Sequence, residues 1–127
     1  MSIRPRPLSP HLQVYRWQLT SVLSILHRGT GLFLVLGTVM IALWVVTLAI
    51  GQTIFASYQT WLGSLLGKVL LVGWSFSLFY HWANGIRHLL WDIGWGYDID
   101  RVYMTGWIVV SVSVILTGLL WLSVAFV

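Results

Sequence analysis

The stretch Gly31–Ile50, GLFLVLGTVMIALWVVTLAI, decides the fold, because it is a long apolar run without a charged side chain. An α-helix rises 1.5 Å per residue, so a run of this length can cross the roughly 30 Å hydrocarbon core of a bilayer. The chain carries no charge from residue 29 to residue 67, and the more polar segment Gly51–Thr53 ends the run. The stretch therefore predicts a transmembrane helix at about residues 20–50.

The composition of the whole chain agrees with a membrane location. Of its 127 residues, 58% are hydrophobic and 8% are charged, whereas an ordinary soluble domain has about 25% charged residues. The mean hydropathy is +0.87, and the chain contains nine tryptophans. These values exclude a soluble globular enzyme, a disordered tail and a nucleic-acid-binding module. They predict an integral membrane protein.

Two further apolar runs follow the first. The second predicted span covers about residues 62–91, with Lys68 near its start, and the third covers about residues 104–126. A less apolar connection precedes the second span, and the turn-rich polar segment Gly94–Arg101 separates the second from the third. The sequence therefore predicts an all-α membrane protein with three transmembrane helices and a single anchor domain.

The positive charges predict the orientation of these spans. With three spans, the N-terminus and the second loop share one side of the membrane, and the other side carries at most Lys68. The side of the N-terminus collects six arginines: Arg4, Arg6, Arg16, Arg28, Arg87 and Arg101. The positive-inside rule places that side in the cytoplasm, or in the matrix of a mitochondrion.

Metal chemistry in this chain must use histidine. The chain has no cysteine, so it can hold no disulfide, iron–sulfur cluster or thiolate-bound metal. Its four histidines are His11, His27, His81 and His88. His11 lies too far from the spans for its role to be derived from physical arguments.

His81 is the deepest ionisable residue of the predicted spans. Helical periodicity places one stripe of residues along the second span: Ser77, His81, Gly85, His88 and Asp92. One interpretation is a neutral histidine that hydrogen-bonds a neighbouring helix. The other is an axial ligand of haem iron, since Gly85 would let a flat macrocycle lie close to the helix.

The histidine positions limit how a haem could be bound. His81 and His88 share one helix and are ~10.5 Å apart along its axis, so they cannot bind one iron from opposite faces. The third span has no histidine, and His27 lies near the end of the first. If the chain binds haem, it supplies half of the ligand pair, and a second membrane subunit must supply the other histidine.

Arg28 opens the first span and also has two interpretations. An isolated arginine there is typical of a topology signal that snorkels to the interface. Ser24, however, precedes it by one helical turn and shares its face. A hydroxyl and a guanidinium at the membrane surface suit the carbonyl oxygens of a quinone head group. Arg87 is expected at a similar depth, and either arginine could pair with haem propionates.

The acidic residues have a simpler interpretation. Asp92, Asp98 and Asp100 lie in or beside the second loop. We expect them to solvate this loop and to pair with Arg101 or with a partner protein.

Three segments make the sequence recognisable as a member of a known family. They are Arg6–Leu12 (RPLSPHL), Ser24–Gly31 (SILHRGTG) and His81–Gly94 (HWANGIRHLLWDIG). With them, the chain resembles the larger cytochrome-b membrane-anchor subunits of succinate dehydrogenase, the respiratory complex II. The resemblance covers about a quarter of the chain by motif, and the three-span layout fits the remainder.

The resemblance implies a role for several residues. His81 matches the haem b axial ligand, with the iron shared with a histidine of the smaller anchor subunit. Ser24 and Arg28 match the quinone-binding residues. His27 matches a motif histidine near the haem propionates and the quinone pocket, and Arg87 and His88 match motif residues near the haem edge. No residue of this chain alone would be catalytic.

The resemblance also implies cofactors, partners and a location. A flavoprotein subunit with FAD would oxidise succinate, and an iron–sulfur subunit would pass the electrons to ubiquinone. A second small anchor subunit would pack with this chain into a helical bundle around one haem b. The expected location is the bacterial cytoplasmic (inner) membrane, favoured because no presequence is recognisable, with the mitochondrial inner membrane as the alternative.

Two other functions remain open at this stage. The anchor of a quinol:fumarate reductase would run the reaction in the opposite direction, although one mid-span histidine argues against the di-haem, five-helix type. A small non-redox transporter or assembly scaffold would explain the three spans. It would not explain the stripe with His81 and Gly85, or the pair formed by Ser24 and Arg28.

Overall fold

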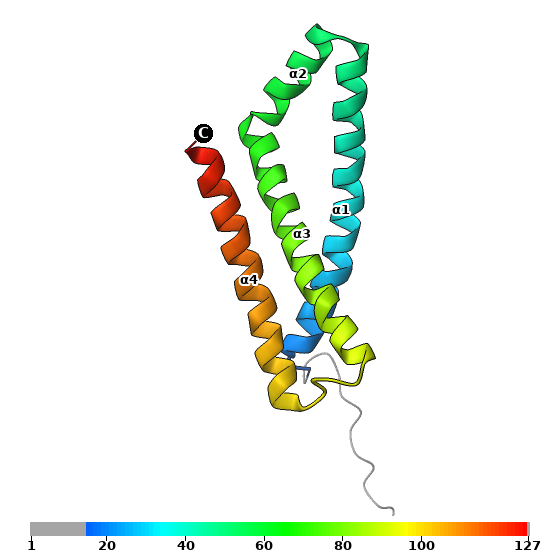
Figure 1. The fold of residues 1–127 in the computed structure, drawn as a ribbon, viewed down its shortest axis with the longest axis vertical. Helices are drawn as coiled ribbons and strands as arrows, with labels where there is room; N and C mark the ends of the chain where they lie inside the picture. Colours follow the sequence, from blue (N-terminus) through cyan, green and yellow to red (C-terminus); the bar gives the residue numbers. More distant parts are fainter. Residues whose placement is uncertain (1–14, 127) are drawn as a thin grey trace, which may run out of the picture.

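The computed structural model describes residues 15–126, and this part of the chain is helical without any strand. Its four α-helices are α1 (Leu19–Ile50), α2 (Gln52–Leu62), α3 (Leu65–Asp92) and α4 (Ile99–Ala125) (Figure 1). The all-α class predicted from the sequence is therefore confirmed. Residues 1–14, which include Arg4 and the Arg6–Leu12 motif with His11, lie outside the described residues.

The long helices have the dimensions of membrane spans. In α1 and α4, the most apolar windows have mean hydropathies of 2.6 and 2.4, and each helix is long enough to cross a membrane. The pair α2 and α3 passes the same test together, with a bend of 75° at the break between them. By length and composition, the described residues therefore contain two spans, or three if the bent pair forms one.

Helix α2 occupies the segment that the sequence predicted only as a less apolar connection. Gly51 has φ of 145°, a conformation that glycine tolerates best, and it separates α1 from α2. At the other end, the Ser64 hydroxyl accepts a hydrogen bond from the Gly67 amide at 3.2 Å and caps α3. The turn at Gly51 and the cap at Ser64 bound a short helix, and α3 starts in a new direction.

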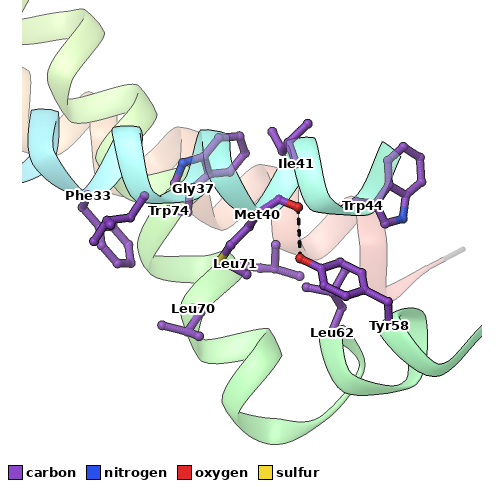
Figure 2. Close-up of a pocket in the computed structure, with 11 residues that line it drawn as sticks. Phe33, Gly37, Met40, Ile41, Trp44, Tyr58, Leu62, Leu70, Leu71 and Trp74 are labelled. Carbon is purple, nitrogen blue, oxygen red and sulfur yellow. Dashed lines mark hydrogen bonds between the residues drawn. The ribbon is translucent and has the colours of Figure 1, made fainter. Parts of the chain in front are cut away.

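Helix α3 lies between the other two long helices (Figure 1). One residue from each long helix forms the small buried apolar core: Leu23 of α1, Tyr80 of α3 and Val109 of α4. The Tyr80 hydroxyl also donates a hydrogen bond to the Leu23 carbonyl at 2.8 Å, which joins α3 to α1. Toward α2, the helices α1 and α3 diverge, and a cavity opens between the three elements (Figure 2).

Polar residues fill much of the interior, and large apolar side chains cover the outside. The buried polar residues are Thr30, Ser75, Ser77, Asn84, Arg87, Ser113 and Thr117. Several hydroxyls bond within their own helix, as Ser113 does to the Val109 carbonyl at 2.6 Å, and Trp121 of α4 donates to the Ser75 hydroxyl of α3 at 3.0 Å. Small and polar side chains at helix contacts, with apolar ones facing outward, are typical of helices packed in a membrane.

Candidate functional site

Three histidines meet where α1 crosses α3. The ring of His27, on α1, stacks on the ring of His81, on α3, with a centroid distance of 4.0 Å and an interplanar angle of 9°. The ring of His88 lies 5.2 Å from that of His27. Stacked rings do not point their nitrogen atoms at a common centre. Accordingly, these three histidines are not arranged to hold a metal ion together, and no other group of three such side chains among the described residues is.

The ring of His81 has a defined hydrogen-bonding partner. Its Nδ1 lies 3.1 Å from the backbone carbonyl oxygen of His27 and 3.4 Å from Thr30 Oγ1. A carbonyl oxygen only accepts hydrogen bonds, so Nδ1 carries the proton and donates. The Nε2 atom of a neutral ring then keeps its lone pair, which is the state in which imidazole binds a metal.

Two glycines leave room around this half-buried ring. A Cβ atom on Gly31 would lie 3.0 Å from His81 Cε1, so glycine lets α1 approach the ring closely. A Cβ atom on Gly85 would meet no atom within 4 Å. One side of the His81 ring is thus covered by α1, while the surface of α3 one turn further on is open.

Arg28 and Ser24 lie together, as the helical spacing predicted. The Arg28 Nη2 atom donates to Ser24 Oγ at 3.2 Å. The side chain of Arg28 is exposed, and His27 precedes it on the same helix. An arginine has five N–H donors in a planar fork, and this contact uses one of them. The pair therefore presents positive charge and hydrogen-bond donors at the surface of α1.

Arg87 turns away from the histidines and toward α4. The residue as a whole is buried, at 4% exposure. Its Nε donates to Thr105 Oγ1 at 3.0 Å and its Nη2 to the Val102 carbonyl at 2.9 Å, both on α4. It also lies over the Trp91 ring, 4.1 Å from the centroid. The sequence predicted Arg87 and Arg28 at a similar depth in the membrane, and that stays a prediction. Arg87 is buried between α3 and α4, and its support of haem propionates also stays a prediction.

We expect Arg87→Ala to destabilise the chain by about 2–4 kcal/mol, because the Thr105 hydroxyl and the Val102 carbonyl would lose a charged, buried partner. The measurement is denaturant unfolding in micelles. Arg101→Ala is the matched control, since Arg101 makes an exposed ion pair with Asp98 at 3.4 Å, typically worth about 0.2–1 kcal/mol. Equal losses for the two variants would contradict the assigned role of Arg87.

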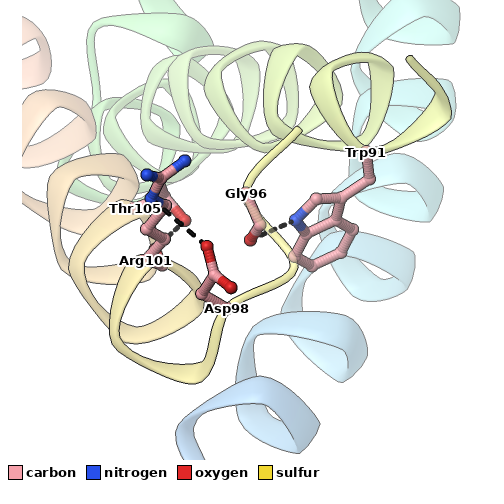
Figure 3. Close-up of polar contacts among 5 residues, drawn as sticks. All are labelled: Trp91, Gly96, Asp98, Arg101 and Thr105. Carbon is pink, nitrogen blue, oxygen red and sulfur yellow. Dashed lines mark hydrogen bonds and ion pairs between the residues drawn. The ribbon is translucent and has the colours of Figure 1, made fainter. Parts of the chain in front are cut away.

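The loop between α3 and α4 is held by local contacts (Figure 3). Gly94 and Gly96 have φ of 83° and 89°, a left-handed conformation that favours glycine. The Trp91 indole donates to the Gly96 carbonyl at 3.3 Å, and Asp98 pairs with Arg101. The expected pairing of a loop aspartate with Arg101 is therefore confirmed for Asp98. The loop directs α4 back along α3.

The fold and the site define a class of protein: a helical membrane protein with a histidine cluster between two long helices and a serine–arginine pair beside it. The family model for succinate dehydrogenase/fumarate reductase transmembrane subunits matches residues 2–120. The chain belongs to this family. The resemblance inferred from the three sequence motifs is thus confirmed.

Curated relatives agree with this assignment. The chain is 45% identical over 116 residues to the succinate dehydrogenase cytochrome b556 subunit of Rickettsia felis, covering 91% of this chain and 90% of the relative. It is 41% identical over 114 residues to the b556 subunit of Paracoccus denitrificans, covering 90% and 88%. It is 43% identical over 118 residues to the mitochondrial cytochrome b560 subunit of Mus musculus, covering 89% and 68%.

Family membership fixes the broad function. The chain is a membrane subunit of a succinate:quinone oxidoreductase complex, as the sequence predicted. The alternative of a non-redox transporter or scaffold is thereby set aside. The family description includes fumarate reductases, whereas the three relatives above carry the name succinate dehydrogenase.

Sequence reasoning missed two features of the site. His27 was expected near the end of the first span, and its contact with His81 was not predicted, because a single sequence does not give the register between two helices. Thr30, within the Ser24–Gly31 motif, was given no role, although its hydroxyl lies 3.4 Å from His81 Nδ1. The spacing of three residues between His27 and Thr30 could have indicated that both face α3.

Proposed function

We propose that this chain is the cytochrome b anchor of the complex, and that His81 is one axial ligand of a haem b shared with a second membrane subunit. The observation that carries the proposal is the contact of His81 Nδ1 with the His27 carbonyl at 3.1 Å. A metal-ligating histidine typically donates its other ring N–H in this way, which fixes its orientation and raises its basicity. The cytochrome b names of the relatives support the same assignment.

The residues around His81 fit a haem. The ring offers Nε2 as a ligand, and no side chain stands beside Gly85, one turn along α3. His27 stacks on His81 and His88 shares its helix, so neither can bind the opposite face of the same iron. The second ligand would come from the smaller anchor subunit. When bound, haem b supplies a one-electron redox centre.

We further propose that Ser24 and Arg28 bind the ubiquinone head group. Both side chains lie on one face of α1 and are joined by a hydrogen bond. The guanidinium can donate to a quinone carbonyl oxygen and stabilise the negative charge that develops there during reduction. Two electrons from the oxidation of succinate to fumarate, with two protons, convert ubiquinone to ubiquinol. His27, next to Arg28, and His88 would line the same region.

The remaining parts of the complex follow from what this chain lacks and exposes. The chain has no cysteine, so the iron–sulfur clusters would belong to an iron–sulfur subunit and FAD to a flavoprotein subunit, both docked on this anchor. Its exposed apolar helix faces would contact lipid and the second anchor subunit. We place the N-terminus in the cytoplasm or matrix, with spans at about residues 20–50, 62–91 and 104–126. The proposed location is the bacterial inner membrane, or alternatively the mitochondrial one.

The sharing of haem is tested by expressing the chain alone. We expect the isolated chain to bind no stoichiometric low-spin haem as a monomer, because it offers one suitable histidine on α3. Co-expression with the second anchor subunit should restore the band in a dithionite-reduced minus oxidised spectrum. Low-spin haem bound at one per monomer by the isolated chain would overturn the shared site.

A further inference from the structure

A cavity of about 190 Å³ lies between α1, α2 and α3, away from the histidine cluster (Figure 2). Its walls come from all three helices, mainly through Phe33, Met40, Trp44, Tyr58, Leu71 and Trp74. No charged side chain lines it. Nothing in the proposed haem or quinone chemistry uses this cavity.

Two of the three polar side-chain groups in the cavity wall, those of Tyr58 and Trp74, already have hydrogen-bond partners. The Tyr58 hydroxyl donates to the Met40 carbonyl at 3.0 Å, as Figure 2 shows. The Trp74 indole donates to the Leu34 carbonyl at 3.5 Å. Sites for polar ligands contain a few placed polar groups that fix orientation, whereas this wall has a single N–H without a partner among the described residues, on the indole of the partly exposed Trp44. An uncharged occupant without hydrogen-bonding groups therefore complements it best.

The fold holds the cavity open. The indole of Trp74 packs directly on Gly37, where a Cβ atom would overlap it, so α1 and α3 touch at this point. Beyond it, the bend of 75° between α2 and α3 spreads the helices, and the Tyr58–Met40 hydrogen bond ties α2 to α1. Apolar cavities of roughly 150 Å³ in proteins stay dry and take up apolar ligands.

The depth of the cavity points to a lipid chain. Met40 lies ten residues before the end of α1 at Ile50, or ~15 Å along the helix. This distance is about half of the ~30 Å hydrocarbon core, so the cavity lies among the acyl chains of the leaflet near α2. Arg28 is a further ~18 Å away along α1. The cavity is thus remote from the proposed quinone head-group site.

We propose that this cavity binds one acyl chain of a membrane phospholipid, inserted between α1 and α3 beneath α2. The bound chain fills the space that the bend creates and completes the packing of α1 against α3. The proposal does not depend on the roles assigned to His81, Ser24 and Arg28.

The test uses the complete complex in nanodiscs of phosphatidylcholine that carries a photoactivatable diazirine midway along one acyl chain. After illumination, mass spectrometry locates the labelled residues. We expect label on cavity residues such as Met40 and Leu71 that persists after exchange into unlabelled lipid, while label on exposed residues is lost. Equal loss at both places would overturn the proposal, because it would indicate only the bulk lipid around the helices.

Three variants sharpen the test. Leu71→Trp fills the cavity and should lower the persistent label about tenfold. The control is Leu43→Trp, because Leu43 lies on α1 at a similar depth but is 49% exposed. It should leave the label unchanged. Met40→Phe is a milder filling variant, and the haem spectrum reports assembly of each.

Absence of cavity label in the wild type would mean that a partner subunit fills the space. Displacement of the label by long-tailed ubiquinone would assign the cavity to an isoprenoid tail. Either result would overturn the proposal.

Discussion

Replacing His81 with alanine is expected to abolish the reduced haem b absorption band of the purified complex. The variant removes the imidazole whose Nε2 we assign to the iron, and the neighbouring rings cannot replace it. The ring of His27 stacks face to face on the ring of His81, and the backbone carbonyl of His27 accepts the hydrogen bond from His81 Nδ1. The measurement is a dithionite-reduced minus oxidised spectrum, with subunit content checked on the same sample. An unchanged spectrum would show that His81 is not the ligand.

Three further variants separate ligation from general damage at this site. His88→Ala should keep the band, because His88 lies ~10.5 Å along α3 from His81. Thr30→Val keeps the ligand but removes a hydroxyl 3.4 Å from its Nδ1. We expect it to keep the band and to make the haem midpoint potential more positive, since a less polarised imidazole donates less charge to iron. Thr30→Ser should restore the wild-type potential.

The fold was predictable from the sequence in the segments where a long uncharged, apolar run determines a membrane-spanning helix. The uncharged run Gly31–Ile50 predicts a long helix, and α1 ends at Ile50, just before the glycine that the sequence marked as a break. Helix α2 was not predicted, because its polar side chains look like those of a loop. Ser57 and Thr60 instead donate hydrogen bonds to carbonyls one turn back within the helix.

The site was predictable within a helix and not between helices. Helical spacing placed Ser24 beside Arg28, and the hydrogen bond between them agrees. The stack of His27 on His81 depends on how α1 and α3 are aligned, which contacts such as Gly31 against the His81 ring set. Likewise, the charge pattern predicted the same membrane side for Arg87 and Arg28, but it could not predict that α4 returns through the loop and buries Arg87 against Thr105. Residue chemistry alone suggested a haem ligand at His81 and a quinone contact at Ser24 and Arg28, and the family motifs implied the same roles.

Arg28→Ala is expected to lower succinate–quinone reductase activity by about 10- to 100-fold while leaving reduction of an artificial soluble acceptor nearly intact. The guanidinium supplies both a donor and a positive charge to the quinone oxygen, and removal of such a group typically costs two to three powers of ten when it is fully enclosed. Because Arg28 is exposed on this chain, we expect a loss smaller than that range. Activity with ubiquinone and activity with the soluble acceptor are measured on the same preparation.

Matched variants distinguish binding of quinone from a topology signal. Arg28→Lys keeps the charge and loses the planar fork, so its activity should fall between those of the wild type and Arg28→Ala. Ser24→Ala removes the neutral hydroxyl and should have a smaller effect, at most about tenfold. Arg101→Ala removes another arginine of the same predicted membrane side, whose partner is Asp98, and should leave both activities unchanged. If Arg28→Ala lost both activities together, Arg28 would act in assembly, because electron transfer to the soluble acceptor does not require a quinone contact.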